Sequence, residues 1–211
     1  MTVYALRVWL PDRPGALGQV ASRIGAVRGD VVGIEILERG PSQVIDEVLV
    51  ELPDDAVVQL LLAEVSQVDG VAVEDVRPVE NGRADGGTLA LEAAVRLANL
   101  ASNHRLDALC GEVLRLTGGD WVVAVHLDRA EPLVQLGDTP DIGWLIAFLA
   151  GSSHLGTDHD AANGPAELAW LHLGRARVAV AVERRNWAFR ARERQHLAAL
   201  GQLVDVLGPL G

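Results

Sequence analysis

The sequence predicts an α+β protein made of two small domains, each with an antiparallel sheet and packed helices. Residues 4–79 follow the order strand, helix, strand, strand, helix, strand, judged from their apolar periodicity. A polar, glycine-rich stretch at 81–87 then shows neither the strand nor the helix periodicity, as is typical of domain linkers. Residues 88–211 begin and end with helical patterns around four strand-like runs. We therefore expect domains at 1–80 and 88–211, joined by a linker at 81–87.

In the first domain, apolar residues alternate with others over a strand at residues 4–10, and a helix with one apolar face runs from Leu17 to Val27. Gly29 is expected to end that helix. Strands at 31–38 and 43–52 flank a turn, and Asp54 and Asp55 are placed to cap a second helix before a last strand at 71–79. The apolar stripe of the second helix comprises Val57, Leu60, Leu61, Val65 and Val68.

Two split crossovers of this kind produce a four-stranded antiparallel sheet with both helices on one face. The first domain is therefore predicted to have the ferredoxin-like βαββαβ fold.

The second domain is expected to have flanking N- and C-terminal helices around an antiparallel sheet. Helical patterns cover 91–101 and 106–114, with a break near 102–104. Strands are predicted at 121–127 and 132–136, followed by a helix at 138–150 and a long polar loop at 151–165. A hairpin of strands 167–173 and 177–183 then leads to a helix that carries Leu197 to Leu207.

Composition excludes several classes of function. The chain has 211 residues and a formal charge of −11, which argues against nucleic-acid binding. It contains no lysine, so a Schiff-base mechanism is excluded, and Cys110 is the only cysteine, so no intrachain disulfide forms. The N-terminus has no signal-peptide pattern, and the longest apolar run, 142–150, is too short to span a bilayer. We expect a soluble cytoplasmic protein, and the alanine- and arginine-rich composition resembles that of high-GC bacteria.

The strand-to-helix turn Asp12-Arg13-Pro14-Gly15-Ala16-Leu17, set in the βαββαβ order, resembles the ACT domain. In that family the domains pair, and this loop meets a neighbouring strand where an amino-acid effector usually sits. The resemblance implies a ligand site formed by the loop residues and by a wall on the second strand, at Val32, Gly33 and Ile34.

The residues suit such a site. Gly15 lacks a Cβ, so a ligand or a second backbone can approach closely. The N-terminus of the following helix attracts a carboxylate, and Asp12 is placed to cap the helix or to receive an ammonium group, with Arg13 as a second carboxylate contact. The same residues also make an ordinary turn and helix start. Gly33 fits a close backbone approach or a β-bulge equally well.

The second domain resembles a GAF domain in its element order and in the segment from Asn186 to Leu197, where GAF domains enter their last helix. GAF domains bind small ligands or only dimerise. The middle loop lacks a cysteine, and the Asn-Lys-x-Phe pattern is missing, so neither a covalently attached bilin nor a cyclic nucleotide is expected.

Other polar clusters favour structural interpretations. His154, Asp158, His159 and Asp160 have metal-ligating side chains, but no zinc motif surrounds them, and a solvated loop is the stronger interpretation. Ser152-Ser153-His154 lacks a nucleophile elbow, and no phosphate-binding motif occurs. Cys110 lies on an apolar helix stripe. We therefore expect no catalytic residues, no metal and no cofactor.

A basic patch comprises Arg184, Arg185, Arg190, Arg192 and Arg194. It either docks an acidic partner or, as the stronger interpretation, is the solvated side of the last helix.

These features predict a non-enzymatic regulatory protein that binds an amino acid or a similar small metabolite at a homodimer interface and signals through an unidentified partner protein. The main alternative is an interaction protein in which both domains serve only oligomerisation or partner docking. A third possibility, an enzyme acting through the histidine-rich loop, requires activity that depends on His154 or His159.

Overall fold

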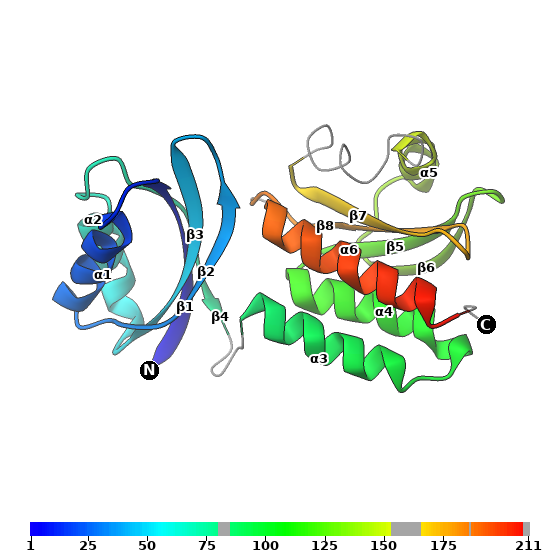
Figure 1. Ribbon diagram of the computed structural model, residues 1–211, viewed down its shortest axis with the longest axis horizontal. Helices are drawn as coiled ribbons and strands as arrows, with labels where there is room; N and C mark the ends of the chain where they lie inside the picture. Colours follow the sequence, from blue (N-terminus) through cyan, green and yellow to red (C-terminus); the bar gives the residue numbers. More distant parts are fainter. Residues whose placement is uncertain (80–84, 153–165, 186, 209–211) are drawn as a thin grey trace. The chain divides into compact units, whose positions relative to one another are not determined.

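The computed structural model describes residues 1–79, 85–152, 166–185 and 187–208 (Figure 1). The chain divides into two compact units, Met1–Asp85 and Gly86–Gly211. The α+β prediction is confirmed, since each unit contains a four-stranded antiparallel sheet in its described part.

The first unit has the predicted ferredoxin-like order. Its elements are β1 (Thr2–Pro11), α1 (Ala16–Ala26), β2 (Asp30–Arg39), β3 (Gln43–Leu52), a short 3-10 turn η1 (Asp55–Val57), α2 (Val58–Val65) and β4 (Ala72–Val79). The strands are arranged β2-β3-β1-β4, so β2 and β4 are the edges of the sheet. Both helices cover the same face of the sheet (Figure 1).

Strand alternation builds the core of this unit. Leu6 and Val8 of β1 and Val48 and Val50 of β3 point toward the helices and are almost fully buried, together with Ile24 of α1. The helix α2 contributes Leu61 and Val65 to the same core. Leu60, which the predicted stripe included, is instead 53% exposed. It is one residue before Leu61 and so points about 100° away around the helix.

The end of α1 differs from the prediction. The helix ends at Ala26, and the residue with left-handed backbone is Arg28, at φ 61°, rather than Gly29. The Gly29 N–H donates to the Ile24 carbonyl, and a Cβ on Gly29 would lie 2.9 Å from Ile24 Cγ2. Gly29 is therefore needed for close packing, whereas the turn itself is made at Arg28.

The second unit contains α3 (Gly86–Ala98), α4 (Ser102–Thr117), β5 (Trp121–His126), β6 (Glu131–Gly137), α5 (Ile142–Ser152), β7 (Leu168–Leu173), β8 (Val178–Glu183) and α6 (Ala191–Val206). Its strands are arranged β6-β5-β8-β7. Gly86 and Gly87, predicted as linker, already belong to α3.

Both faces of the second sheet are covered. On one face α3, α4 and α6 enclose a core that includes Leu97, Leu109, Val180 and Leu200. On the other face α5 packs Leu145 and Leu149 against β5, β7 and β8. In the part of the chain that the structure describes, no helix is long and apolar enough to cross a membrane.

Candidate functional site

The turn between β1 and α1 is the first candidate site. Gly15 occupies the N-cap position of α1 with left-handed backbone, at φ 88°. Added side chains are strained at such an angle, so this position favours glycine. A Cβ on Gly15 would meet no atom of the described residues within 4 Å, so among them the backbone of Gly15 borders open space.

The helix start leaves amide groups available. No side chain caps α1. The Ala16 N–H donates to Arg13 and the Gln19 N–H donates to Gly15, but Leu17 and Gly18 have no acceptor for their N–H groups among the described residues. These two N–H groups lie at the positive end of the helix dipole, where an anionic oxygen is stabilised.

Asp12 does not cap the helix, contrary to one of the two roles expected for it. Its carboxylate lies 3.5 Å from the guanidinium of Arg39, at the end of β2, and both side chains are exposed. The Asp12 N–H donates to the Ser42 carbonyl in the turn between β2 and β3. The loop is thus tied to one end of β2.

Arg13 and Pro14 lie on the exposed surface of the same turn, while Ala16 is buried and Leu17 half-buried. The guanidinium of Arg13 has no ion-pair partner within the described ranges. This side chain is therefore available to a ligand that approaches Gly15.

The predicted wall on β2 is an exposed apolar edge. Val32 and Ile34 are 51% and 48% exposed, and Ile36 continues the row at 43%. The register between β2 and β3 shifts between Val31 and Gly33, so a bulge is present. A Cβ on Gly33 would also lie 3.1 Å from Leu49 Cδ1. Gly33 therefore lies both at a β-bulge and at a close approach, the two explanations that the sequence left open.

The loop and the wall are not adjacent within one chain. Arg39, which contacts the loop, is seven residues from Val32 along β2, a distance of roughly 20 Å in a strand. A single copy therefore presents two halves of the predicted site at different places.

Asp46 on β3 is a residue that the sequence interpretation missed. It is buried opposite Val8 of β1 and Ile36 of β2, and its Oδ1 has no hydrogen-bond partner among the described residues. Burial raises the pKa of the Asp46 carboxyl; the positive charge of Arg39 opposes this rise, and the negative charge of Asp12 adds to it. The signal in the sequence was the pair Asp46-Glu47 within the otherwise apolar run from Val44 to Val50, with Asp46 in phase with the buried Val48 and Val50.

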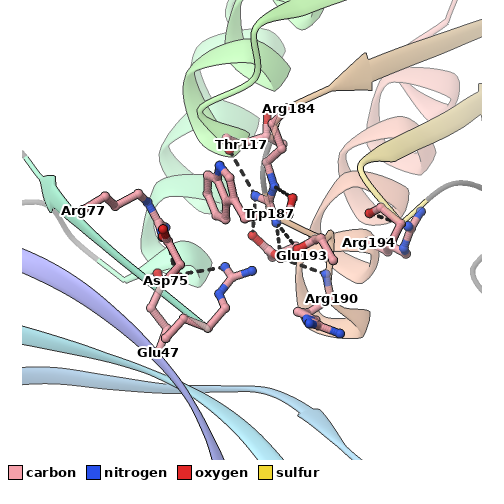
Figure 2. A network of polar contacts seen from close by, with 12 residues as sticks. Glu47, Asp75, Arg77, Thr117, Arg184, Trp187, Arg190, Glu193 and Arg194 are labelled. Carbon is pink, nitrogen blue, oxygen red and sulfur yellow. Dashed lines mark hydrogen bonds and ion pairs between the residues drawn. The ribbon is translucent and has the colours of Figure 1, made fainter. Parts of the chain in front are cut away.

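Polar networks elsewhere hold the units together internally. On the first sheet, Arg77 pairs with Glu47 and Asp75 at 2.8 Å each (Figure 2). Arg7 pairs with Glu47 at 2.9 Å. The Arg7–Glu47 pair joins the neighbouring strands β1 and β3, as cross-strand charge pairs do. The Arg77–Asp75 pair lies within β4, and the Arg77–Glu47 pair reaches from β4 over β1 to β3.

The predicted basic patch in the second unit is not one solvated surface. Arg184 is buried and pairs with Glu193 at 2.6 and 2.7 Å (Figure 2). Its guanidinium also lies over the rings of Trp187 and Phe189, at 3.4 and 3.9 Å from their centroids. Arg184 is therefore a structural group.

The remaining candidates do not form a reactive site. Cys110 is fully buried, and burial, with a smaller contribution from Asp107, raises its pKa to about 12. No cluster of three metal-ligating side chains occurs in the described ranges. The candidates Ser153, His154, Asp158, His159 and Asp160 lie outside the described residues.

Comparison with known proteins identifies the first unit. Residues 4–70 match the family model of the ACT domain. ACT domains are regulatory domains that generally bind amino acids, and this chain carries one at its N-terminus.

Other similarities are more distant. Over 105 residues the chain is 25% identical to NAD-dependent malic enzyme 1 of Bacillus subtilis, covering 49% of this chain and 24% of that enzyme. The chain thus spans about a quarter of the length of this curated relative.

Two solved structures show weak likeness. The C-terminal domain of the MgtC protein from Mycobacterium tuberculosis is 21% identical, with a TM-score of 0.32 over 40% of this chain and 95% of that domain. A formyltetrahydrofolate deformylase from Pseudomonas putida KT2440 is also 21% identical, with a TM-score of 0.30 over 45% of this chain and 38% of that one. Scores this low establish no shared fold.

Proposed function

We propose that the protein is a non-enzymatic regulator whose ACT unit binds an amino acid, or a similar small metabolite, between two copies of the chain. The observation that carries this proposal is the uncapped start of α1 beside Gly15, where two backbone N–H groups border open space. A ligand carboxylate accepts from Leu17 and Gly18, and Arg13 adds a second contact.

Pairing of two β2 edges would complete the site. Edge strands with exposed apolar side chains are surfaces on which a second strand adds. If two β2 strands pair antiparallel about their midpoint near Glu35, Arg39 of one copy lies opposite Val31 of the other. The loop that Asp12 ties to Arg39 then lies beside Val32 and Gly33 of the second copy. The two separated halves of the site meet in this arrangement.

Carboxylates near the loop give a place for the ammonium group of an amino acid. Asp12 is exposed and close to Arg39, and Asp46 is buried on the next strand with an unused oxygen among the described residues. A buried carboxylate without a partner gains most from a cationic ligand, because its desolvation is otherwise uncompensated. The ligand class is therefore a zwitterion rather than a simple carboxylate.

The second unit is assigned the role of a GAF-like module that assists dimerisation or contacts a partner protein. Its helices α3 and α6 lie on the same face of the sheet as α4, and each has an exposed apolar side chain, Leu91 on α3 and Val206 on α6. A cytoplasmic location and a bacterial origin stay predictions from the sequence.

A panel of the twenty amino acids tests the ligand site. At millimolar concentration, the true ligand is expected to raise the melting temperature of the full chain, since ligand at a hundred times its Kd stabilises the folded state by about 2.7 kcal/mol. Gly15→Asn is expected to abolish the shift, because asparagine tolerates the left-handed backbone but fills the open space.

The matched control is Gly118→Asn. Gly118 also has left-handed backbone, at φ 62°, and a Cβ there would meet only Trp187 at 3.7 Å. This variant is expected to keep the full amino-acid shift. Indifference of the wild-type chain to all twenty amino acids would favour the interaction protein that only oligomerises.

Ile34→Glu tests the pairing of β2 separately. With the axis near Glu35, residue 34 of one copy lies opposite Ile36 of the other. A glutamate at position 34 therefore sets a charge against an apolar side chain, and we expect sedimentation to show loss of the dimer. Leu60→Glu is the control, because Leu60 is as exposed but lies on α2 of the same unit. A dimer that survives Ile34→Glu contradicts the pairing of β2.

A further inference from the structure

A cavity of about 410 Å³ opens in the second unit. It lies between the C-terminal end of α6 and the end of the sheet where β5 meets β6 and β7 meets β8, and α4 closes one side. This volume is in the range of small-molecule sites, which span roughly 300–1,000 Å³. It belongs to a different unit from the ACT loop, so nothing in the proposed amino-acid site accounts for it.

The floor of the cavity is apolar. It is formed by Leu106 of α4, Leu133 of β6, Leu173 of β7, Val178 of β8 and Val204 of α6. Leu173, Val178 and Val204 are almost fully buried, so the floor is part of the packed core and holds its shape. Such a surface accepts a hydrocarbon group.

The mouth of the cavity is mainly cationic. Arg175, Arg129 and His126 line it, against the carboxylate of Asp205. Asp205 Oδ1 already accepts the backbone N–H of Arg175 at 3.0 Å, which ties the turn between β7 and β8 to α6. Among the described lining residues, Asp205 is the one carboxylate, and this hydrogen bond uses one of its oxygens to hold the turn.

The two arginines differ in their partners. Arg129 pairs with Glu131 at 2.9 Å. The guanidinium of Arg175 has no carboxylate partner in the part of the chain that the structure describes. Neighbouring Arg177, in contrast, pairs with Asp128 at 2.7 Å. Arg175 is thus the cation at the mouth that remains available for an anion.

His126 adds a further polar group. Its Nδ1 accepts the backbone N–H of Arg129 at 3.4 Å, so a neutral ring carries its proton on Nε2 and has one more hydrogen bond to donate. The cavity therefore combines a hydrocarbon floor with donors at its mouth. Arg129 is neutralised by Glu131, and the guanidinium of Arg175 stands beside the carboxylate of Asp205 without an ion pair among the described residues.

We propose that this cavity binds a small organic monocarboxylate. Its hydrocarbon part lies on the floor of leucine and valine side chains, and its carboxylate takes a bidentate contact from Arg175, as guanidinium and carboxylate groups do. Asp205 at the mouth disfavours a second negative charge on the ligand. The site is independent of the ACT loop and makes the second unit a second sensing surface.

Hexanoate is the probe that tests this site, measured by calorimetry with the full chain. We expect hexanoate to bind, and we expect both acetate, which lacks the chain, and hexanol, which lacks the charge, to bind at least tenfold more weakly. Arg175→Gln is expected to weaken hexanoate about tenfold, since a hydrogen bond to a charged group contributes about 1.5–3 kcal/mol. Ala176→Leu, which extends a side chain into the cavity, is expected to weaken it as well.

Arg185→Gln is the matched control, because Arg185 is an exposed arginine at the opposite end of β8. It is expected to keep the affinity of the wild-type chain, and melting curves confirm that each variant is folded. Failure of hexanoate to bind at millimolar concentration overturns the proposal. Equal binding of hexanol, or equal affinity in folded Arg175→Gln, overturns it too. None of these three results bears on the amino-acid site, since the ACT loop is unchanged in these variants.

Discussion

Removal of the Arg184 side chain is expected to destabilise the second unit strongly. Its guanidinium donates to both carboxylate oxygens of Glu193, at 2.6 and 2.7 Å. It also donates to the carbonyls of Thr117, Trp187 and Ala188, at 3.1, 3.2 and 2.7 Å. With 1% of the side chain exposed, Arg184 makes these contacts inside the unit, away from bulk water.

The size of the stability loss depends on the Glu193 carboxylate, which stays in place when the Arg184 side chain is removed. Breaking a buried ion pair by removing one partner costs about 3–5 kcal/mol, because the other charge is left uncompensated. Glu193 keeps the hydrogen bond from the Arg190 N–H at 2.8 Å, so we expect Arg184→Ala to lose about 4 kcal/mol within that range. Arg184→Ala combined with Glu193→Ala is expected to lose less than the sum of the two single variants, because neither charge remains.

Thermal unfolding followed by circular dichroism measures the loss. Arg185→Ala is the control, since Arg185 is 60% exposed and pairs with Asp138 only at 3.7 Å. Exposed pairs of this kind contribute about 0–1 kcal/mol. A loss below about 1 kcal/mol in Arg184→Ala would refute the reasoning, because it would mean that the buried pair does not hold the unit together.

Two further predictions concern single titratable groups. Cys110 is expected not to react with a thiol reagent at pH 8 while the chain is folded, because burial raises its pKa to about 12; rapid labelling of the native chain would contradict its buried position. Asp46→Asn is expected to raise the melting temperature at pH 7 but not at pH 3.5. The raised pKa of Asp46 means that the folded state favours the protonated form, so the native chain loses stability as pH rises through that pKa, and asparagine avoids this loss. Equal melting temperatures of variant and wild type at pH 7 would refute this.

Much of the first unit was predictable from the sequence, because its strands alternate cleanly. The strand predicted at 43–52 coincides with β3, and Asp54 caps the following turn through its bond from the Ala56 N–H at 2.9 Å. Local signals of this kind depend only on neighbouring residues. The ACT family was also recognisable, since the loop and the order of elements both lie in one continuous stretch.

Features that depend on tertiary contacts were not predictable. Arg184 looked like one member of a solvated basic run, and only the fold brings Glu193 and Thr117 around it. Asp46 carries no local sign that its oxygen lacks a partner. The cavity is lined by residues almost a hundred positions apart in the sequence, among them Leu106, Arg175 and Val204, so no local motif predicts it.

Native mass spectrometry of the full chain, with and without the amino acid that stabilises it, tests the central claim most directly. We expect the dimer to carry the amino acid, and we expect the monomer produced by Ile34→Glu to bind it far more weakly. An isolated monomer that binds the amino acid as tightly as the dimer would contradict a site built between two copies. So would a wild-type dimer that carries no amino acid at any concentration.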